Sequence, residues 1–150
     1  MSALAEQLKA AYVGGDPAAV LAVVPYARFL DMTAQLEPEG PVFALAFQER
    51  LIGNIAIPAL HGGVVAGFLE VATIAHLMWH SQTAELPKTI NFSIDYLRSA
   101  RSATTYAACR LTRVGRRVAQ VGAEAWQEDR SRPVAVVRAH FLLPELLSQD

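Results

Sequence analysis

The stretch from Asn54 to His80, NIAIPALHGGVVAGFLEVATIAHLMWH, decides the fold of this 150-residue chain. After its paired glycines it is apolar nearly all round, which predicts a helix over about residues 62–80 that other elements must enclose. One carboxylate, Glu70, lies in the middle of that helix. Buried carboxylates are rare without a partner. We therefore expect Glu70 at a seam, where it is either a structural oddity or a functional acid.

The residues around this helix predict short helices and strands. Leu4 and Leu8 have helical spacing within residues 2–12, and Asp16-Pro17 is typical of a helix start that continues to about residue 24. Apolar and polar residues alternate in KTINFSIDYLR, residues 88–98, as in a strand with one core face. The expected strands are Tyr26–Leu36, Pro41–Arg50, 88–98, 103–114, 117–128 and 134–143.

Two strands, one long apolar helix and four further strands form an antiparallel α+β domain. A strongly curved sheet of about six strands is the only enclosure available to the helix, which is the hot-dog fold. The length fits a single domain over residues 1–150, with residues 1–25 as an N-terminal helical extension.

Composition limits the partners and the compartment. Hydrophobic residues make up 53% and charged residues 18%, so part of the apolar surface is expected to meet a second copy in a homo-oligomer. The net charge of -1 argues against nucleic acid as a partner. The single cysteine, Cys109, excludes an internal disulfide, and charges interrupt the N-terminal apolar run, so a cytoplasmic location is expected. Glu70 and His76 would be costly in lipid, so we expect no membrane span.

The start of the long helix has the features of an oxyanion site. Gly62 and Gly63 leave unpaired N–H groups at a positive dipole end, and such donors can hold a developing negative charge. Asn54 and His61 precede them and could add side-chain donors. Alternatively, the glycines only let the chain turn into the helix.

Distance separates the two candidate groups within one chain. Gly62 and Glu70 are eight residues apart, or roughly 12 Å of helix rise, which a glutamate side chain cannot span. If both act on one substrate, two helices must run antiparallel across a dimer axis, so that each start faces the other chain's acid. A dimer, or a tetramer formed as a dimer of dimers, satisfies this requirement.

The motif HGGVVAGFLE resembles the helix start of hot-dog acyl-CoA thioesterases of the phenylacetate-pathway type, over about Phe43 to Leu143. The resemblance implies acyl-CoA hydrolysis in which the Gly62 amide and Asn54 polarise the thioester carbonyl. It also implies that Glu70 from the partner subunit acts as base or nucleophile. The remaining site residues that it implies are His61, which would line the pocket, and Thr89, which would assist the acid or be an ordinary solvent-facing threonine.

Two features depart from the family pattern. Many relatives have aspartate where this chain has Glu70, and the longer acid leaves open whether it activates water or attacks directly. Asn54 lies seven residues before His61, one more than in some relatives, which weakens its assignment.

The CoA end of the substrate requires cations, because guanidinium groups suit phosphate oxygens. Arg116 and Arg117 in the VGRR turn are the candidates, with Gly63 also expected at the substrate. Each arginine could equally be a solubilising surface charge.

No metal or cofactor is expected, since the histidines lack metal-binding spacing and Cys109 has no evident histidine partner. Two other functions stay open: a non-catalytic acyl-CoA-binding protein and an enoyl-CoA hydratase of the same fold. The hydratase is weakened because NIAIPAL, before His61, contains no acid. The pattern does not distinguish aromatic from aliphatic acyl groups.

Overall fold

The computed structural model describes residues 2–144 and contains one six-stranded antiparallel sheet. Its strands follow the order β1-β2-β6-β7-β8-β5, and a separate two-stranded ribbon joins β3 to β4. The strands are β1 (Thr33–Glu37), β2 (Gly40–Leu45), β3 (Ile52–Asn54), β4 (Ala59–Leu60), β5 (Lys88–Tyr96), β6 (Thr105–Val114), β7 (Val118–Trp126) and β8 (Ala135–Leu142).

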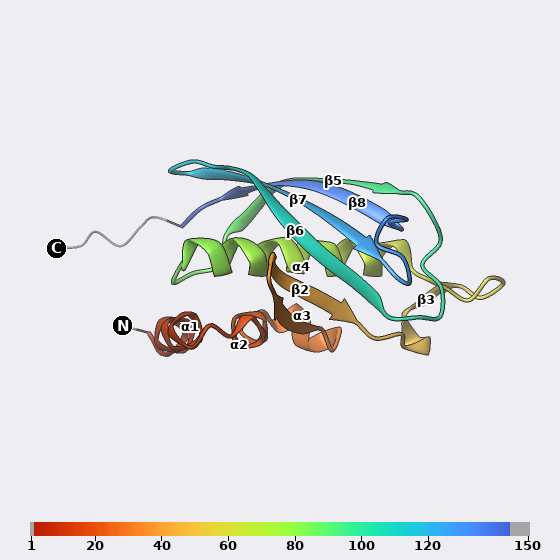
Figure 1. Cartoon of the computed structure of the whole chain (residues 1–150), viewed down its shortest axis with the longest axis horizontal. Helices are drawn as coiled ribbons and strands as arrows, with labels where there is room; N and C mark the ends of the chain where they lie inside the picture. The colour runs from red at the N-terminus through yellow and green to blue at the C-terminus, as the bar shows by residue number, and fades with distance from the viewer. Residues whose placement is uncertain (1, 145–150) are drawn as a thin grey trace.

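The helix α4 (Gly62–Ser81) lies along the concave side of this sheet, as Figure 1 shows. Three short helices, α1 (Ala3–Gly14), α2 (Pro17–Ala22) and α3 (Pro25–Phe29), precede β1, and α2 and α3 pack against α4. A 3-10 turn, η1 (Glu49–Leu51), precedes β3. The hot-dog fold predicted from the apolar helix is confirmed.

The apolar residues of α4 form the centre of the core. Phe68, Leu69, Leu77 and Met78 are fully buried, and they belong to one cluster that also includes Leu8 of α1. The N-terminal helices are therefore packed into the same core as the sheet. The helical segment also continues to Phe29 of α3, beyond the expected boundary at residue 25.

The expected strand Tyr26–Leu36 is wrong in its first half. Pro25 occupies the first position of α3, where its fixed φ favours a helix, and the chain turns at Asp31 with φ 54° before β1 begins at Thr33. The strand expected up to Arg50 ends at Leu45.

The last strand of the sheet, β5, is less buried than its alternating pattern predicted. Ile90 is 56% exposed and Tyr96 is 54% exposed. Only β8 pairs with β5 within residues 2–144, and the pairing shifts register between Thr89 and Asn91. One edge of β5, together with part of its apolar face, is thus left uncovered in the single chain.

By length and composition alone α4 could cross a membrane. Most of its apolar window is buried inside the chain, however, as is typical of the core helix of a folded domain.

Candidate active site

The carboxylate of Glu70 is half-buried and has one side-chain partner among the described residues. The Thr89 hydroxyl on β5 donates to Glu70 Oε1 at 3.2 Å. Glu70 lies on a partly exposed stripe of α4 together with Gly63 and Gly67, at the spacing of one helix face. The structure thus joins Glu70 to Thr89, the residue that the family resemblance selected.

Thr73 and His76 are two polar residues of α4 that follow Glu70. Thr73 is fully buried and its hydroxyl donates to the Glu70 carbonyl oxygen at 2.7 Å, because a buried hydroxyl must find an acceptor. Burial, with a smaller effect of the charge of nearby His80, lowers the pKa of His76 to about 4. His76 therefore belongs to the protein interior rather than to the stripe that carries Glu70.

At the start of α4, the amides of Gly62 and Gly63 differ in their partners. His61 is the N-cap, and its Nδ1 accepts the Gly63 N–H at 2.8 Å. The next two amides, of Val64 and Val65, donate to the His61 carbonyl. Within residues 2–144 the Gly62 N–H has no acceptor. Gly62 is therefore the amide that remains available to a ligand, whereas the Gly63 amide is already engaged.

Tyr96, at the end of β5, fixes this helix start from the sheet. Its hydroxyl donates to the Gly62 carbonyl at 2.7 Å. A hollow of about 370 Å³ opens beside this contact. Its lining comprises Asn54, Ile57, Ala59, Leu60, Gly62, Val65, Tyr96, Leu97, Arg98, Ser99, Ala100 and Val134.

The structure brings Asn54 to the same hollow as Gly62 but does not bring His61 there. Asn54 Oδ1 accepts the Ala56 N–H at 3.0 Å, and the side-chain NH₂ group makes no hydrogen bond within residues 2–144. The side chain of His61 folds back onto Gly63, and a Cβ at Gly53 would clash with the His61 backbone. His61 is thus held as a helix cap.

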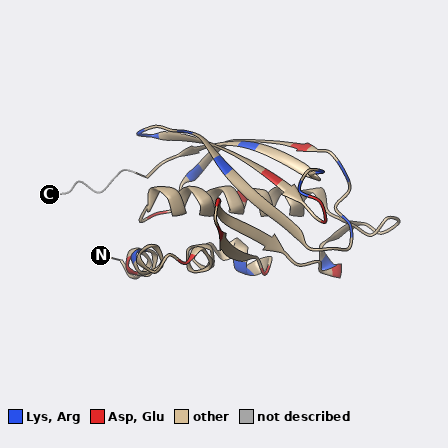
Figure 2. Cartoon of the chain, viewed as in Figure 1, with Lys and Arg blue, Asp and Glu red and all other residues tan. Residues whose placement is uncertain are grey.

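The arginines that could bind CoA phosphates lie at opposite ends of the sheet. Arg116 and Arg117 are exposed in the β6–β7 turn, where Figure 2 shows basic residues at the end away from β3. Arg98, by contrast, lines the hollow beside Gly62. Tyr96 and Arg98 are two residues of this hollow that were not among the site residues expected from the sequence. The sequence feature that could have indicated both residues is their position at or just after the end of β5, which lies beside the start of α4.

Cys109 and the histidines do not form a second reactive site. Burial raises the pKa of the Cys109 thiol, which disfavours the nucleophilic thiolate. Among residues 2–144, no group of three or more His, Cys, Asp or Glu side chains is arranged to hold a metal ion.

Comparison with known proteins identifies the family. The family model of the Thioesterase superfamily matches residues 58–134, a segment that contains Gly62, Glu70 and Thr89. The chain belongs to the thioesterase superfamily. The medium/long-chain acyl-CoA thioesterase YigI of Salmonella typhimurium is 34% identical over 122 residues, covering 71% of this chain and 77% of that protein. YigI of Escherichia coli K12 is 32% identical over 120 residues, with the same two coverages.

Solved structures share the fold of this chain. A Chromobacterium violaceum protein is 41% identical, with a TM-score of 0.76 over 94% of this chain and 98% of that one. The E. coli PaaI protein from the phenylacetic acid degradation operon shares the fold, with a TM-score of 0.69 and 19% identity over 95% of this thioesterase and 100% of PaaI. This member of the superfamily is a thioester hydrolase.

Proposed function

We propose that this thioesterase hydrolyses acyl-CoA at a site shared by two copies of the chain. The observation that carries the proposal is the placement of Glu70 and Gly62 at opposite ends of β5. Thr89, near the first end, contacts Glu70, and Tyr96, at the last residue, contacts Gly62. One chain therefore presents an acid at one end of its edge strand and a free amide at the other.

Pairing β5 with the β5 of a second copy would bring Glu70 of one chain close to Gly62 of the other. Two identical edge strands related by a twofold axis pair antiparallel, so the Thr89 end of one strand lies beside the partner's Tyr96 end. The free edge of β5 and its exposed Ile90 are the surface that such pairing would cover. Each dimer would then contain two sites, each with Glu70 from one copy and Gly62 from the other.

In this arrangement Glu70 acts as the general base. Thr89 occupies Oε1, which leaves Oε2 to accept a proton from water as the water oxygen attacks the thioester carbonyl carbon. The Gly62 amide and the Asn54 side chain of the other copy stabilise the oxyanion. When the tetrahedral intermediate collapses, the carbon–sulfur bond breaks, the proton on Glu70 passes to the sulfur, and the free acid and CoA leave.

The CoA portion is assigned to cations at the site's edge. Arg98 lines the hollow next to Gly62. In Figure 1 the β6–β7 turn lies at the opposite end of the domain from the start of α4. An antiparallel dimer would therefore turn the Arg116–Arg117 end of one sheet toward the partner's helix start. Phosphate oxygens favour such guanidinium groups. The names of the YigI relatives support medium- or long-chain acyl groups as the substrate class.

The experiment is a CoA-release assay with acetyl-, octanoyl- and dodecanoyl-CoA on wild type and Glu70→Gln. Glutamine keeps the size of the side chain and removes the base, so kcat should fall by about two orders of magnitude or more with an unchanged melting temperature. Wild-type rates in Glu70→Gln would rule out Glu70 as the base. Absence of CoA release from every substrate by the wild-type protein would rule out the proposed activity.

A further inference from the structure

Two aromatic side chains of α3 lie exposed near the acid. Tyr26 is 43% exposed and Phe29 is 59% exposed, and their rings stack with centroids 5.7 Å apart and an interplanar angle of 12°. Aromatic rings carry large apolar areas whose burial is strongly favourable. We call this pair the aromatic wall.

The aromatic wall stands directly against the helix that carries Glu70. A Cβ at Gly67 would lie 2.8 Å from Tyr26 Cε1 and 3.2 Å from its hydroxyl oxygen, so only glycine admits the ring at this distance. Gly67 precedes Glu70 by three residues, about one helical turn, so both lie on the same face of α4. Along this face Glu70 contacts Thr89 of β5, and the Tyr26 ring packs one turn away, on Gly67.

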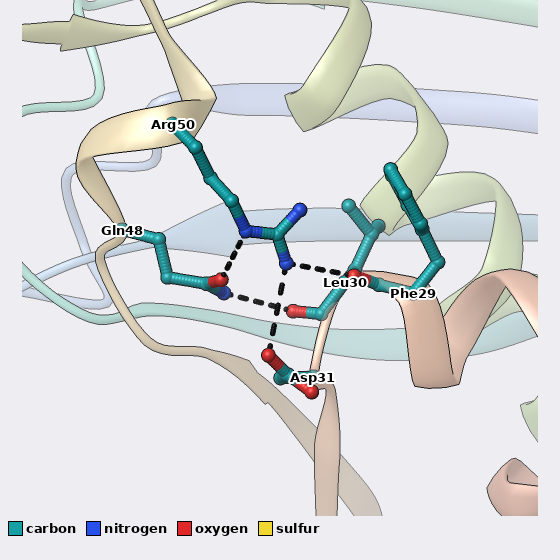
Figure 3. A network of polar contacts seen from close by, with 5 residues as sticks. All are labelled: Phe29, Leu30, Asp31, Gln48 and Arg50. Atoms are coloured by element: carbon teal, nitrogen blue, oxygen red, sulfur yellow. Dashed lines mark hydrogen bonds and ion pairs between the residues drawn. The ribbon is translucent and has the colours of Figure 1, made fainter.

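A polar network behind the wall fixes its position, as Figure 3 shows. The Arg50 guanidinium lies 5.2 Å from the Phe29 ring centroid and donates to the Phe29 carbonyl at 2.8 Å. Gln48 accepts from Arg50 at 2.9 Å and donates to the Leu30 carbonyl at 3.1 Å. Asp31 lies 3.7 Å from the same guanidinium. These contacts tie the end of α3 to the segment before β3, so the wall is a fixed surface.

We propose that Tyr26 and Phe29 form the wall against which the apolar acyl chain of the substrate lies, and that they set the preference for longer acyl groups. The proposal rests on the proposed function, since it places the reacting carbonyl beside Glu70. The CoA portion extends from the reacting carbonyl toward the cations of the site. The acyl chain extends from the same carbonyl in another direction and requires apolar surface there. On the α3 side of Glu70, that surface is the aromatic wall. An acetyl group is too short to extend along it.

Removing the wall should therefore act on long acyl groups selectively. Each methylene that loses apolar contact weakens binding by about fourfold. Loss of contact with about two methylenes should lower the octanoyl-to-acetyl ratio of kcat/KM about fifteenfold in Tyr26→Ala, mainly through KM for octanoyl-CoA. Tyr26→Phe keeps the ring and should keep the ratio. The matched control is Leu36→Ala, another exposed apolar side chain, which lies on β1 and should leave the ratio unchanged.

A second variant tests the wall without deleting it. Gly67→Ala forces the Tyr26 ring off α4, while alanine is a better helix former than glycine. The octanoyl-to-acetyl ratio of kcat/KM should fall in this variant. The melting temperature should not fall. A ratio unchanged in both Tyr26→Ala and Gly67→Ala, or an equal loss for both substrates, would overturn the proposal.

Binding separates failure of the wall from failure of the proposed function. Octanoyl-CoA and free CoA are titrated calorimetrically into Glu70→Gln and into Glu70→Gln with Tyr26→Ala. The wall predicts about fifteenfold weaker octanoyl-CoA binding in the double variant and equal binding of CoA. This result holds whether or not the wild type hydrolyses the ester, and equal octanoyl-CoA affinities would reject the wall even if hydrolysis is confirmed.

Discussion

Replacing Thr89 by valine removes the one hydrogen bond to the Glu70 carboxylate found in residues 2–144, at nearly constant shape. A net hydrogen bond to a charged group contributes about 1.5–3 kcal/mol. The 3.2 Å distance and the exposure of Thr89 place this bond at the low end. If the carboxylate is held in its reactive orientation by this bond, the loss of about 1.5 kcal/mol corresponds to about a tenfold lower kcat.

The assay measures initial rates of CoA release from octanoyl-CoA by Thr89→Val and Thr89→Ser. Serine retains the hydroxyl and should retain most of the activity, whereas KM should change little in either variant because the bond orients the acid rather than the substrate. Loss of about 1.5 kcal/mol should also lower the melting temperature of Thr89→Val by about 3–6 °C, whereas Thr89→Ser should melt near the wild-type temperature. A wild-type kcat in Thr89→Val would refute the assignment of Thr89 as the residue that positions Glu70.

Three further outcomes are expected. Because burial lowers the folded pKa of His76 to about 4 from an unfolded value of 6.5, the unfolded chain binds the proton first. The free energy of unfolding should thus reach its plateau above pH 6.5 and fall by up to about 3 kcal/mol toward pH 4. In urea titrations, His76→Leu should flatten this pH dependence. Charge reversal at both Arg116 and Arg117 should raise KM for acyl-CoA more than it lowers kcat, an effect that shrinks with salt and whose absence would place the phosphates elsewhere. Tyr96→Phe deletes the bond to the Gly62 carbonyl and should lower the free energy of unfolding by about 1 kcal/mol and reduce kcat; unaltered values of both would show that this contact does not hold the helix start.

The elements best predicted from the sequence are those with a strong period. The helix expected over residues 62–80 is observed as Gly62–Ser81, because continuous apolar character and a glycine start leave few alternatives. The first expected strand failed at α3, where tertiary packing of Tyr26 on Gly67 and the proline start outweigh local strand propensity.

The candidate site was predicted in part. Glu70 could be identified as an unusual acid in an apolar helix, and its partner Thr89 was selected by family resemblance. The roles of Tyr96 and His61 could not be predicted, because both depend on a side-chain direction at the junction of β5 with α4. Which amide stays free at a helix start is decided by the cap geometry, and spacing along the sequence does not specify it.

The most direct test of the shared site mixes two inactive variants, Glu70→Gln and Gly62→Pro. Proline at the first helical position removes the free amide and is otherwise tolerated there, and His61, with φ -59° and ψ 134°, already has a backbone suited to a following proline. The added Cβ would lie 3.3 Å from the Tyr96 hydroxyl, so the melting temperature of this variant is measured alongside its activity.

Each variant alone should be inactive. After equal amounts are unfolded and refolded together, about half of the dimers are hybrids with one intact site each, so octanoyl-CoA hydrolysis should recover to about a quarter of the wild-type rate per chain. If native mass spectrometry shows that hybrid dimers have formed but no activity returns, Glu70 and Gly62 do not act together across two copies.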